Sequence, residues 1–152
     1  MKTALLLLAL ASTAAAKDDP DADFTGSYAY TGTVTITLTS PAAKTITDSD
    51  DGHLTITASK KGGFVLTFTS KGETCQVTAA RSGKTGIKLA AGQTCEMTDK
   101  DAKADFTITL TTGTGTLNDD ALTMNLAWKL TGSIGGVAVT GRAAESIQAE
   151  SK

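Results

Sequence analysis

Apolar and polar residues alternate along almost the whole chain from Phe24 onward. In each row, apolar residues two positions apart are separated mostly by threonine, serine or charged residues. This period is typical of a β-strand that buries one face, so each row predicts a half-buried antiparallel strand. The rows are Val34/Ile36/Leu38, Leu54/Ile56/Ala58, Phe64/Leu66/Phe68, Cys75/Val77/Ala79, Ile87/Leu89/Ala91, Phe106/Ile108/Leu110, Leu122/Met124/Leu126/Trp128/Leu130 and Val137/Val139.

Turn-forming residues separate the rows, and no segment shows a convincing helical period. The connections are too short for helical crossovers, so neighbouring strands should pair antiparallel. We predict an all-β fold, a single antiparallel meander barrel of about 8–10 strands, because closure removes exposed sheet edges; a sandwich is the alternative. The turn signals are Asp51-Gly52, Lys61-Gly62-Gly63, Lys71-Gly72, Ser82-Gly83, Ala91-Gly92, Asn118-Asp119-Asp120 and Gly135-Gly136.

The two ends of the chain differ from this pattern. Residues 1–16 have a positive Lys2, a short leucine-rich run and a small-residue cleavage pattern, which predict a signal peptide. Residues 17–23 (KDDPDAD) predict a flexible acidic lead-in. The β domain is expected to span residues 24–143, followed by a frayed C-terminal tail over residues 144–152.

Export agrees with the cysteine content. The chain has only two cysteines, Cys75 and Cys95, and a lone pair in an oxidising compartment is most simply one disulfide. The bond would close a loop of about 21 residues and stabilise the fold by about 3 kcal/mol in the chain-entropy model. We expect an exported protein, either periplasmic or extracellular.

Composition and charge exclude several function classes. The 152 residues carry a net charge of -2 with no basic stripe, which argues against a nucleic-acid partner. Two cysteines and one histidine are too few for a Cys/His zinc framework. There is no G-x-S-x-G motif and no glycine-rich phosphate loop. His53 follows a turn signal and is expected to be a solvated strand-edge residue. We therefore expect no catalysis and no cofactor.

Acidic residues leave two weaker possibilities. Glu73, Glu96, Asp99 and Asp101 are close to the cysteines in sequence, and ordinary solvated surface suits them better than paired glycosidase carboxylates. The segment Asp48-Ser49-Asp50-Asp51-Gly52 does not have EF-hand spacing, since glycine falls at the fifth position and Ser59 at the twelfth. A looser calcium site built from Asp48, Asp50 and Asp51 stays open, as does an acidic turn.

Threonine repeatedly occupies the polar face, in T-x-T pairs such as Thr33/Thr35/Thr37 and Thr107/Thr109/Thr111. The pairs share their dipeptide spacing with some ice-binding β-solenoids, but their intervals are too irregular for a solenoid repeat. Threonine also suits any solvent-facing strand. This polar second face, with one Trp and two Tyr in the chain, argues against a membrane-spanning barrel, which needs aromatic girdles.

Gly26-Ser27-Tyr28 near the start of the predicted domain and Arg142 near its end resemble the arrangement in lipocalin-like (calycin) barrels. Those barrels open with a Gly-x-Trp strand and carry a late arginine that packs over the tryptophan. Here Tyr28 replaces that tryptophan, and the middle motif of the family is missing. The resemblance implies a cup-shaped barrel that holds a small apolar ligand without catalysis, with Tyr28 and Arg142 as barrel-closing residues.

Two functional interpretations follow. In the first, the protein binds a small hydrophobic molecule inside the barrel. In the second, it is a cell-envelope or extracellular structural or interaction protein with a filled core and a threonine-rich surface. An eight-stranded barrel is wide enough either to fill itself or to hold one small ligand, so the sequence leaves both open. The expected pocket lining is Phe68, Phe106, Met124, Leu126 and Trp128.

Overall fold

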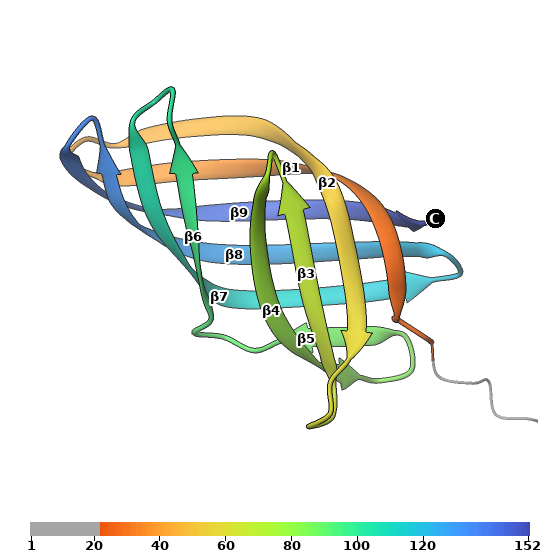
Figure 1. Cartoon of the computed structure of the whole chain (residues 1–152). Helices are drawn as coiled ribbons and strands as arrows, with labels where there is room; N and C mark the ends of the chain where they lie inside the picture. Colours follow the sequence, from red (N-terminus) through yellow and green to blue (C-terminus); the bar gives the residue numbers. More distant parts are fainter. Residues whose placement is uncertain (1–21) are drawn as a thin grey trace, which may run out of the picture.

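The structure, a computed structural model, describes residues 22–152, and within them the chain forms nine β-strands (Figure 1). The predicted signal peptide and residues 17–21 of the lead-in lie outside the described residues. The strands are β1 (Gly26–Ser40), β2 (Lys44–Ala58), β3 (Phe64–Ser70), β4 (Glu73–Ser82), β5 (Gly86–Leu89), β6 (Thr94–Asp99), β7 (Ala104–Asn118), β8 (Ala121–Ile134) and β9 (Val137–Ser151).

All nine strands belong to one antiparallel sheet that closes on itself. The strand order is β5-β4-β3-β2-β1-β9-β8-β7-β6, and β5 also pairs with β7. The eight strands other than β6 therefore form a ring, and β6 lies beside the other end of β7. The predicted closed antiparallel meander is confirmed, with β5 and β6 as two pieces that both pair with β7.

The ring has one seam where side chains replace backbone pairing. Strand β4 pairs with β5 only through residues 79–82, so its first half has no backbone ladder to β6. A disulfide between Cys75 and Cys95 bridges this gap, which confirms the predicted pairing. The side-chain amide of Gln93 accepts a hydrogen bond from the Thr78 backbone N–H at 2.6 Å and donates one to the Thr78 carbonyl at 3.1 Å. Gln93 thus pairs with β4 much as a peptide group would.

The ring has a closed part and an open part. In the closed part, β3, β4 and β5 complete the circle. In the open part, the long strands β2, β1, β9, β8 and β7, together with β6, extend beyond that circle, and the β2 and β6 edges pair with no further strand among the described residues. Figure 1 shows these long strands running side by side away from the short β3–β5 segment.

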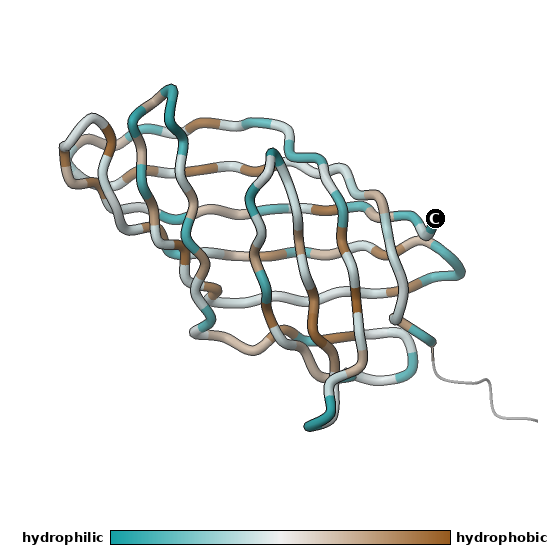
Figure 2. Tube along the Cα trace, viewed as in Figure 1, coloured by the Kyte–Doolittle hydropathy of each residue, from teal (hydrophilic) through white to brown (hydrophobic). Residues whose placement is uncertain are grey.

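Apolar side chains fill the closed part. Apolar and polar positions alternate along each strand (Figure 2), so one side chain in two points into the ring. Completely or almost completely buried side chains come from every strand of the ring, and no polar or charged residue is buried among the described residues. The largest are Phe24, Leu54, Ile56, Leu66, Ile87, Leu110, Leu122, Met124, Ile147 and Val77.

Aromatic side chains cover the end of the closed part of the ring. Phe24, just before β1, is 0% exposed and packs edge-on against Phe64 with ring centroids 5.5 Å apart. The guanidinium of Arg81 lies 5.4 Å from the centroid of the Phe24 ring and 5.5 Å from that of Phe64. Cation–π contacts of this kind stabilise aromatic surface that would otherwise face water.

Two sequence predictions about strand ends are wrong. Asp51-Gly52 was predicted to be a turn, but it lies inside β2. Glycine is needed there for close approach, because a Cβ on Gly52 would meet the Thr69 carbonyl oxygen and would lie 2.9 Å from the Tyr30 hydroxyl. Residues 144–152 were expected to fray, but all except the last belong to β9, where Ile147 and Ala149 are each 1% exposed.

No helix among the described residues is long and apolar enough to cross a membrane.

Candidate functional site at the open end of the ring

A layer of polar side chains separates the closed part from the open part. We call it the polar layer, and it consists of Tyr30, Asp50, Ser70, Trp128 and Glu145. Ser70 donates a hydrogen bond to Asp50 Oδ1 at 2.8 Å, and Tyr30 donates one to Asp50 Oδ2 at 3.2 Å. The indole N–H of Trp128 donates to Glu145 Oε2 at 3.3 Å. All five side chains point into the ring, where burial strengthens each polar contact.

Backbone register brings the two carboxyl groups of this layer together. Strand β1 lies between β2 and β9; Asp50 pairs with Gly32 of β1, and Glu145 pairs with Val34 of the same strand. Gly32 has no side chain, and a Cβ there would lie 2.6 Å from the Ser146 carbonyl oxygen. Asp50 and Glu145 therefore meet across β1, within hydrogen-bonding reach of each other.

The surroundings of Glu145 change its protonation. Burial, and then the charge of Asp50, raise the pKa of Glu145 to about 7, while the hydrogen bond from Trp128 opposes this shift. A hydrogen bond between two carboxyl groups needs one proton, and below neutral pH Glu145 holds it. Burial and the Asp50 carboxylate also raise the pKa of Tyr30, so its hydroxyl stays a hydrogen-bond donor.

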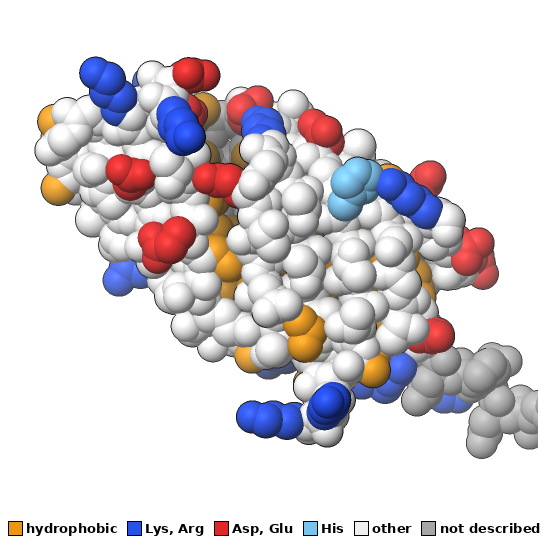
Figure 3. Space-filling model, viewed as in Figure 1, with side chains coloured by type: hydrophobic (Ala, Val, Ile, Leu, Met, Phe, Trp, Pro, Cys, Tyr) orange, Lys and Arg blue, Asp and Glu red, His pale blue; other side chains and the backbone are white. Residues whose placement is uncertain are grey.

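Beyond the polar layer, the inner face of the open part is apolar but only partly covered. Val34, Ile36 and Phe106 are half-buried and pack against the edge of the core. Further along, Ile46 is 39% exposed and Met97 is 44% exposed. Figure 3 shows apolar side chains in the gap between β6 and the β3–β4 hairpin. The open part thus presents an apolar wall that ends at a pair of carboxyl groups.

The residues predicted to line a pocket all point into the ring, but they divide between its two parts. Phe68, Met124 and Leu126 are buried in the core of the closed part. Trp128 belongs to the polar layer, and Phe106 lies in the open part with some of its surface exposed. Phe106 is therefore the predicted residue placed at the partly exposed inner face, and Trp128, 5% exposed, lies where that face meets the core.

Tyr28 and Arg142, the pair suggested by the lipocalin resemblance, do not meet. Tyr28 is buried near one end of β1, pairs with Ser151 and donates a hydrogen bond to the Phe24 carbonyl at 2.9 Å. Arg142 is exposed on the outer face and pairs with Thr37 near the other end of β1. The arginine that stacks on aromatic rings at the closed end is Arg81 instead.

The acidic candidates named from the sequence do not form a metal site. Asp48 and Asp50 point into the ring and Asp51 points outward, because neighbouring strand residues alternate in direction, so the three cannot share one ion. No group of three or more potential ligands lies together in residues 22–152. His53 is exposed within β2, and its Nδ1 lies 3.0 Å from Lys152 Nζ.

The carboxylates near the cysteines hold β6 and the turn after it. Glu73 accepts a hydrogen bond from the Thr98 backbone N–H at 2.6 Å, across the β4–β6 seam. Glu96 accepts hydrogen bonds from the Thr107 hydroxyl, and Asp99 accepts two from backbone N–H groups of the following turn. These contacts account for the carboxylates as structural groups.

Sequence reasoning missed the carboxyl pair, although a signal for it exists. Glu145 lies in phase with Ala143, Ile147 and Ala149, so a period of two carried to the end of the chain would place it inside the ring. Asp50 lies in phase with Leu54, and interpreting Gly52 as a turn concealed that relation.

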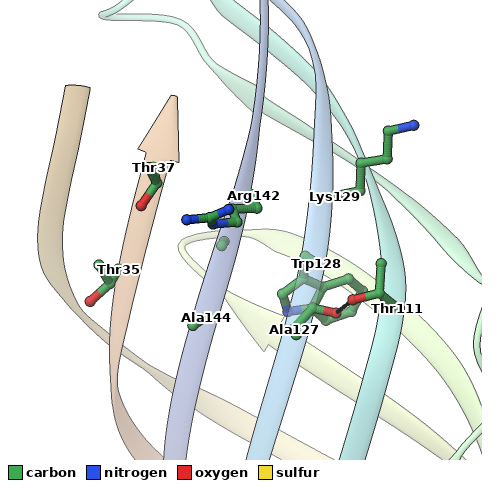
Figure 4. A pocket seen from close by; sticks show the side chains of 9 residues that line it. Thr35, Thr37, Thr111, Ala127, Trp128, Lys129, Arg142 and Ala144 are labelled. Carbon is green, nitrogen blue, oxygen red and sulfur yellow. Dashed lines mark hydrogen bonds between the residues drawn. The ribbon is translucent and has the colours of Figure 1, made fainter. Parts of the chain in front are cut away.

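A second concave feature lies on the outer face, over the middle of β8 and β9. This groove, of about 430 Å³, has alanines in its floor and threonine hydroxyls at its rim (Figure 4). Thr111 is the extra residue of a β-bulge between Leu110 and Thr112, and its hydroxyl donates to the Ala127 carbonyl at 2.9 Å. The lining residues are Thr35, Thr37, Thr111, Ala127, Trp128, Lys129, Arg142, Ala143 and Ala144.

Comparison with known proteins adds little to this geometry. No protein-family model and no curated protein matches the sequence. Among solved structures, a Bacteroides fragilis protein described as a "putative outer membrane protein" is similar, with 14% identity and a TM-score of 0.45 over 84% of this chain. A Nostoc punctiforme protein of unknown function from the DUF3598 family has 10% identity and a TM-score of 0.35 over 86% of this chain. The chain spans half the length of each of these two proteins. At these scores the likeness supports no statement about function.

Proposed function

We propose that this protein is an exported, non-catalytic binding protein that holds a small hydrophobic molecule in the open part of the ring. The observation that carries the proposal is the partly exposed apolar inner face that ends at a partly buried carboxyl pair. Ligand sites are typically apolar hollows with a few convergent polar groups and titratable groups of shifted pKa.

The apolar wall supplies the binding energy in this proposal. Val34, Ile36 and Phe106 have exposed apolar surface next to the core, and a ligand body that covered them would gain about 25 cal/mol for each Å² removed from water. The indole ring of Trp128 forms the boundary with the closed part. Because the apolar side chains of the closed part are buried against one another, we expect the ligand to rest against that core instead of entering it.

The polar layer determines which hydrophobic molecule fits. Asp50 and Glu145 can accept hydrogen bonds, and Asp48 adds a third carboxylate on the same inner face of β2. A ligand with an amine or another donor group at one end satisfies these acceptors. A ligand carboxylate would meet like charge, which disfavours it.

Fluorescence of Trp128, the only tryptophan in the sequence, tests the proposal directly. Octylamine, octanol and octanoate share one alkyl chain and differ in the head group. We expect a saturable change in Trp128 emission with octylamine, a weaker one with octanol and the weakest with octanoate. If none of the three produces a saturable change, the proposed site does not exist.

Two variants and one control assign the binding to this site. Glu145→Gln should remove most of the preference for octylamine over octanol, by about tenfold, because a charge-assisted contact is lost. Ile36→Thr should weaken binding of all three probes by about fivefold, since it removes apolar contact. Thr33→Ser, on the outer face of the same strand, should change nothing. Equal weakening by all three variants would contradict the assignment.

A further inference from the structure

The groove on the outer face combines two cations with no acidic neighbour. Lys129 of β8 and Arg142 of β9 are directly opposite each other in the sheet. On their other sides, Arg142 pairs with Thr37 and Lys129 pairs with Thr109. Their diagonal neighbours on the same face are likewise only threonine and alanine. Like charges directly opposite each other destabilise a sheet.

Neither cation is neutralised by a residue that the structure describes. Among residues 22–152, no hydrogen bond or ion pair involves the Arg142 guanidinium or the Lys129 ammonium group. In Figure 4, the Arg142 side chain extends toward Thr37 of β1, and Lys129 extends toward β7, so the two diverge on either side of the groove. The low alanine floor leaves the space between them open.

We propose that this groove binds an oxyanion, a phosphate or carboxylate group carried by a small sugar-sized molecule. The guanidinium of Arg142 can donate two parallel hydrogen bonds to such a group. Lys129 adds a second positive charge on a flexible stem, and the hydroxyls of Thr35 and Thr37 lie at the same rim. Binding would relieve the repulsion between the two cations.

The dimensions of the groove indicate the size of the ligand. A volume of about 430 Å³ is much larger than a bare phosphate needs and falls within the range of small-molecule sites. The methyl groups of Ala127 and Ala144 provide a shallow apolar floor on which a sugar ring can lie. Apart from Trp128 and Ala143, whose side chains point into the ring, the groove lining is on the opposite face of the sheet from the polar layer, so the inference does not rest on the proposed hydrophobic ligand.

Amide NMR shifts of the mature protein test this inference. Four compounds are titrated separately: glucose 6-phosphate, glucuronate, inorganic phosphate and glucose. We expect saturable shifts around Thr35, Thr37, Ala127 and Ala144 with the two charged sugars, weaker ones with phosphate and none with glucose. A response to only one charged sugar would identify phosphate or carboxylate as the recognised group. Absence of shifts at these amides with both charged sugars would overturn the proposal.

Charge variants distinguish a site from general attraction to a positive surface. Arg142→Gln and Lys129→Gln should each weaken binding of the charged sugars by about tenfold or more. Without ligand, each should raise Tm by about 2 °C, because the like-charge pair is removed. Lys60→Gln, in the exposed β2–β3 turn, should leave affinity within about twofold, as expected for a distant screened charge. Equal weakening by all three variants would mean non-specific attraction and would refute the site.

Discussion

The closed and open parts of the ring are built from the same alternating pattern, yet they bury their apolar residues to very different degrees. Leu54 and Leu66 in the closed part are 0% exposed, whereas Ile46 in the open part, on the same strand and face as Leu54, is 39% exposed. The difference is whether β3, β4 and β5 complete the circle, because an inward side chain is covered only when strands face it from across the ring. The alternation of apolar and polar residues determines which way a side chain points, and closure of the ring determines whether that side chain is buried.

Polar groups occur where the two parts meet. In the closed part a carboxyl group would lose its hydration entirely, and in the open part it would keep it. At the boundary, Asp50 and Glu145 are held by the hydroxyls of Tyr30 and Ser70 and by the indole of Trp128. This contrast is the basis for our proposal that the closed part supplies stability and the open part binds the ligand.

The largest expected effect tests that contrast with a matched pair of truncations. Leu54→Ala in the closed part should lower the free energy of unfolding by about 3 kcal/mol, because the surrounding side chains cannot collapse into the cavity. Ile36→Ala in the open part should cost about half as much, since part of its surface already faces water. Urea unfolding of both variants measures the difference. Equal losses would show that the open part is packed as tightly as the closed part.

Breaking the disulfide across the seam between β4 and β6 is expected to have an effect of similar size. The Cys75→Ala/Cys95→Ala variant should be less stable by about 3 kcal/mol, since the disulfide closes a loop across a sequence separation of 20 residues. Hydrogen exchange should accelerate in β6, which has a backbone ladder on one side only, more than in β8, which is paired on both sides.

Chemical reduction of the unmodified protein is the control for this variant. Reduction breaks the covalent link but keeps both sulfur atoms in place as packing groups, so it separates the link from the volume of the side chains. If reduction leaves the stability and the exchange of β6 unchanged, the seam is held by Gln93 and Glu73 and not by the disulfide.

Most of the fold could be predicted from the sequence, because period-two alternation is a local property. The rows around Phe64, Ile108 and Met124 each became a strand in the expected phase. The errors occurred where one residue type can have either of two structural roles, as glycine can in a turn or inside a strand. Gly52 was interpreted as a turn, but it is a glycine that allows Tyr30 and β3 to approach β2 closely.

The candidate site was less predictable because it depends on contacts between distant segments. Asp50 and Glu145 are nearly a hundred residues apart in the chain and meet only because β1 pairs with both β2 and β9. Local composition around Glu145, rich in alanine and glutamate, suggested a solvated tail. The pairing of the whole sheet also determines which strand edges stay unpaired. No single row of residues contains that information.

The smallest of the three effects concerns the pH dependence of stability, through the carboxyl pair. The pKa of Glu145 is about 7 in the folded protein and near 4.5 when unfolded, so the folded state binds the proton more tightly. This contribution to stability is fully present below about pH 4.5 and is lost as the pH rises through 7. Urea unfolding should therefore show a loss on the order of 2 kcal/mol between pH 5 and pH 8 from this group.

Two glutamate variants on β9 isolate the source of that dependence. Glu145→Gln cannot ionise, so its free energy of unfolding should change less between pH 5 and pH 8 and should exceed that of the unmodified protein at pH 8. Glu150→Gln, on the exposed outer face of the same strand, should keep the full dependence. If Glu150→Gln reduced the pH dependence of the free energy of unfolding as much as Glu145→Gln, that dependence would come from the overall charge of the protein. Protonation of Glu145 at the boundary between the two parts would then not explain it.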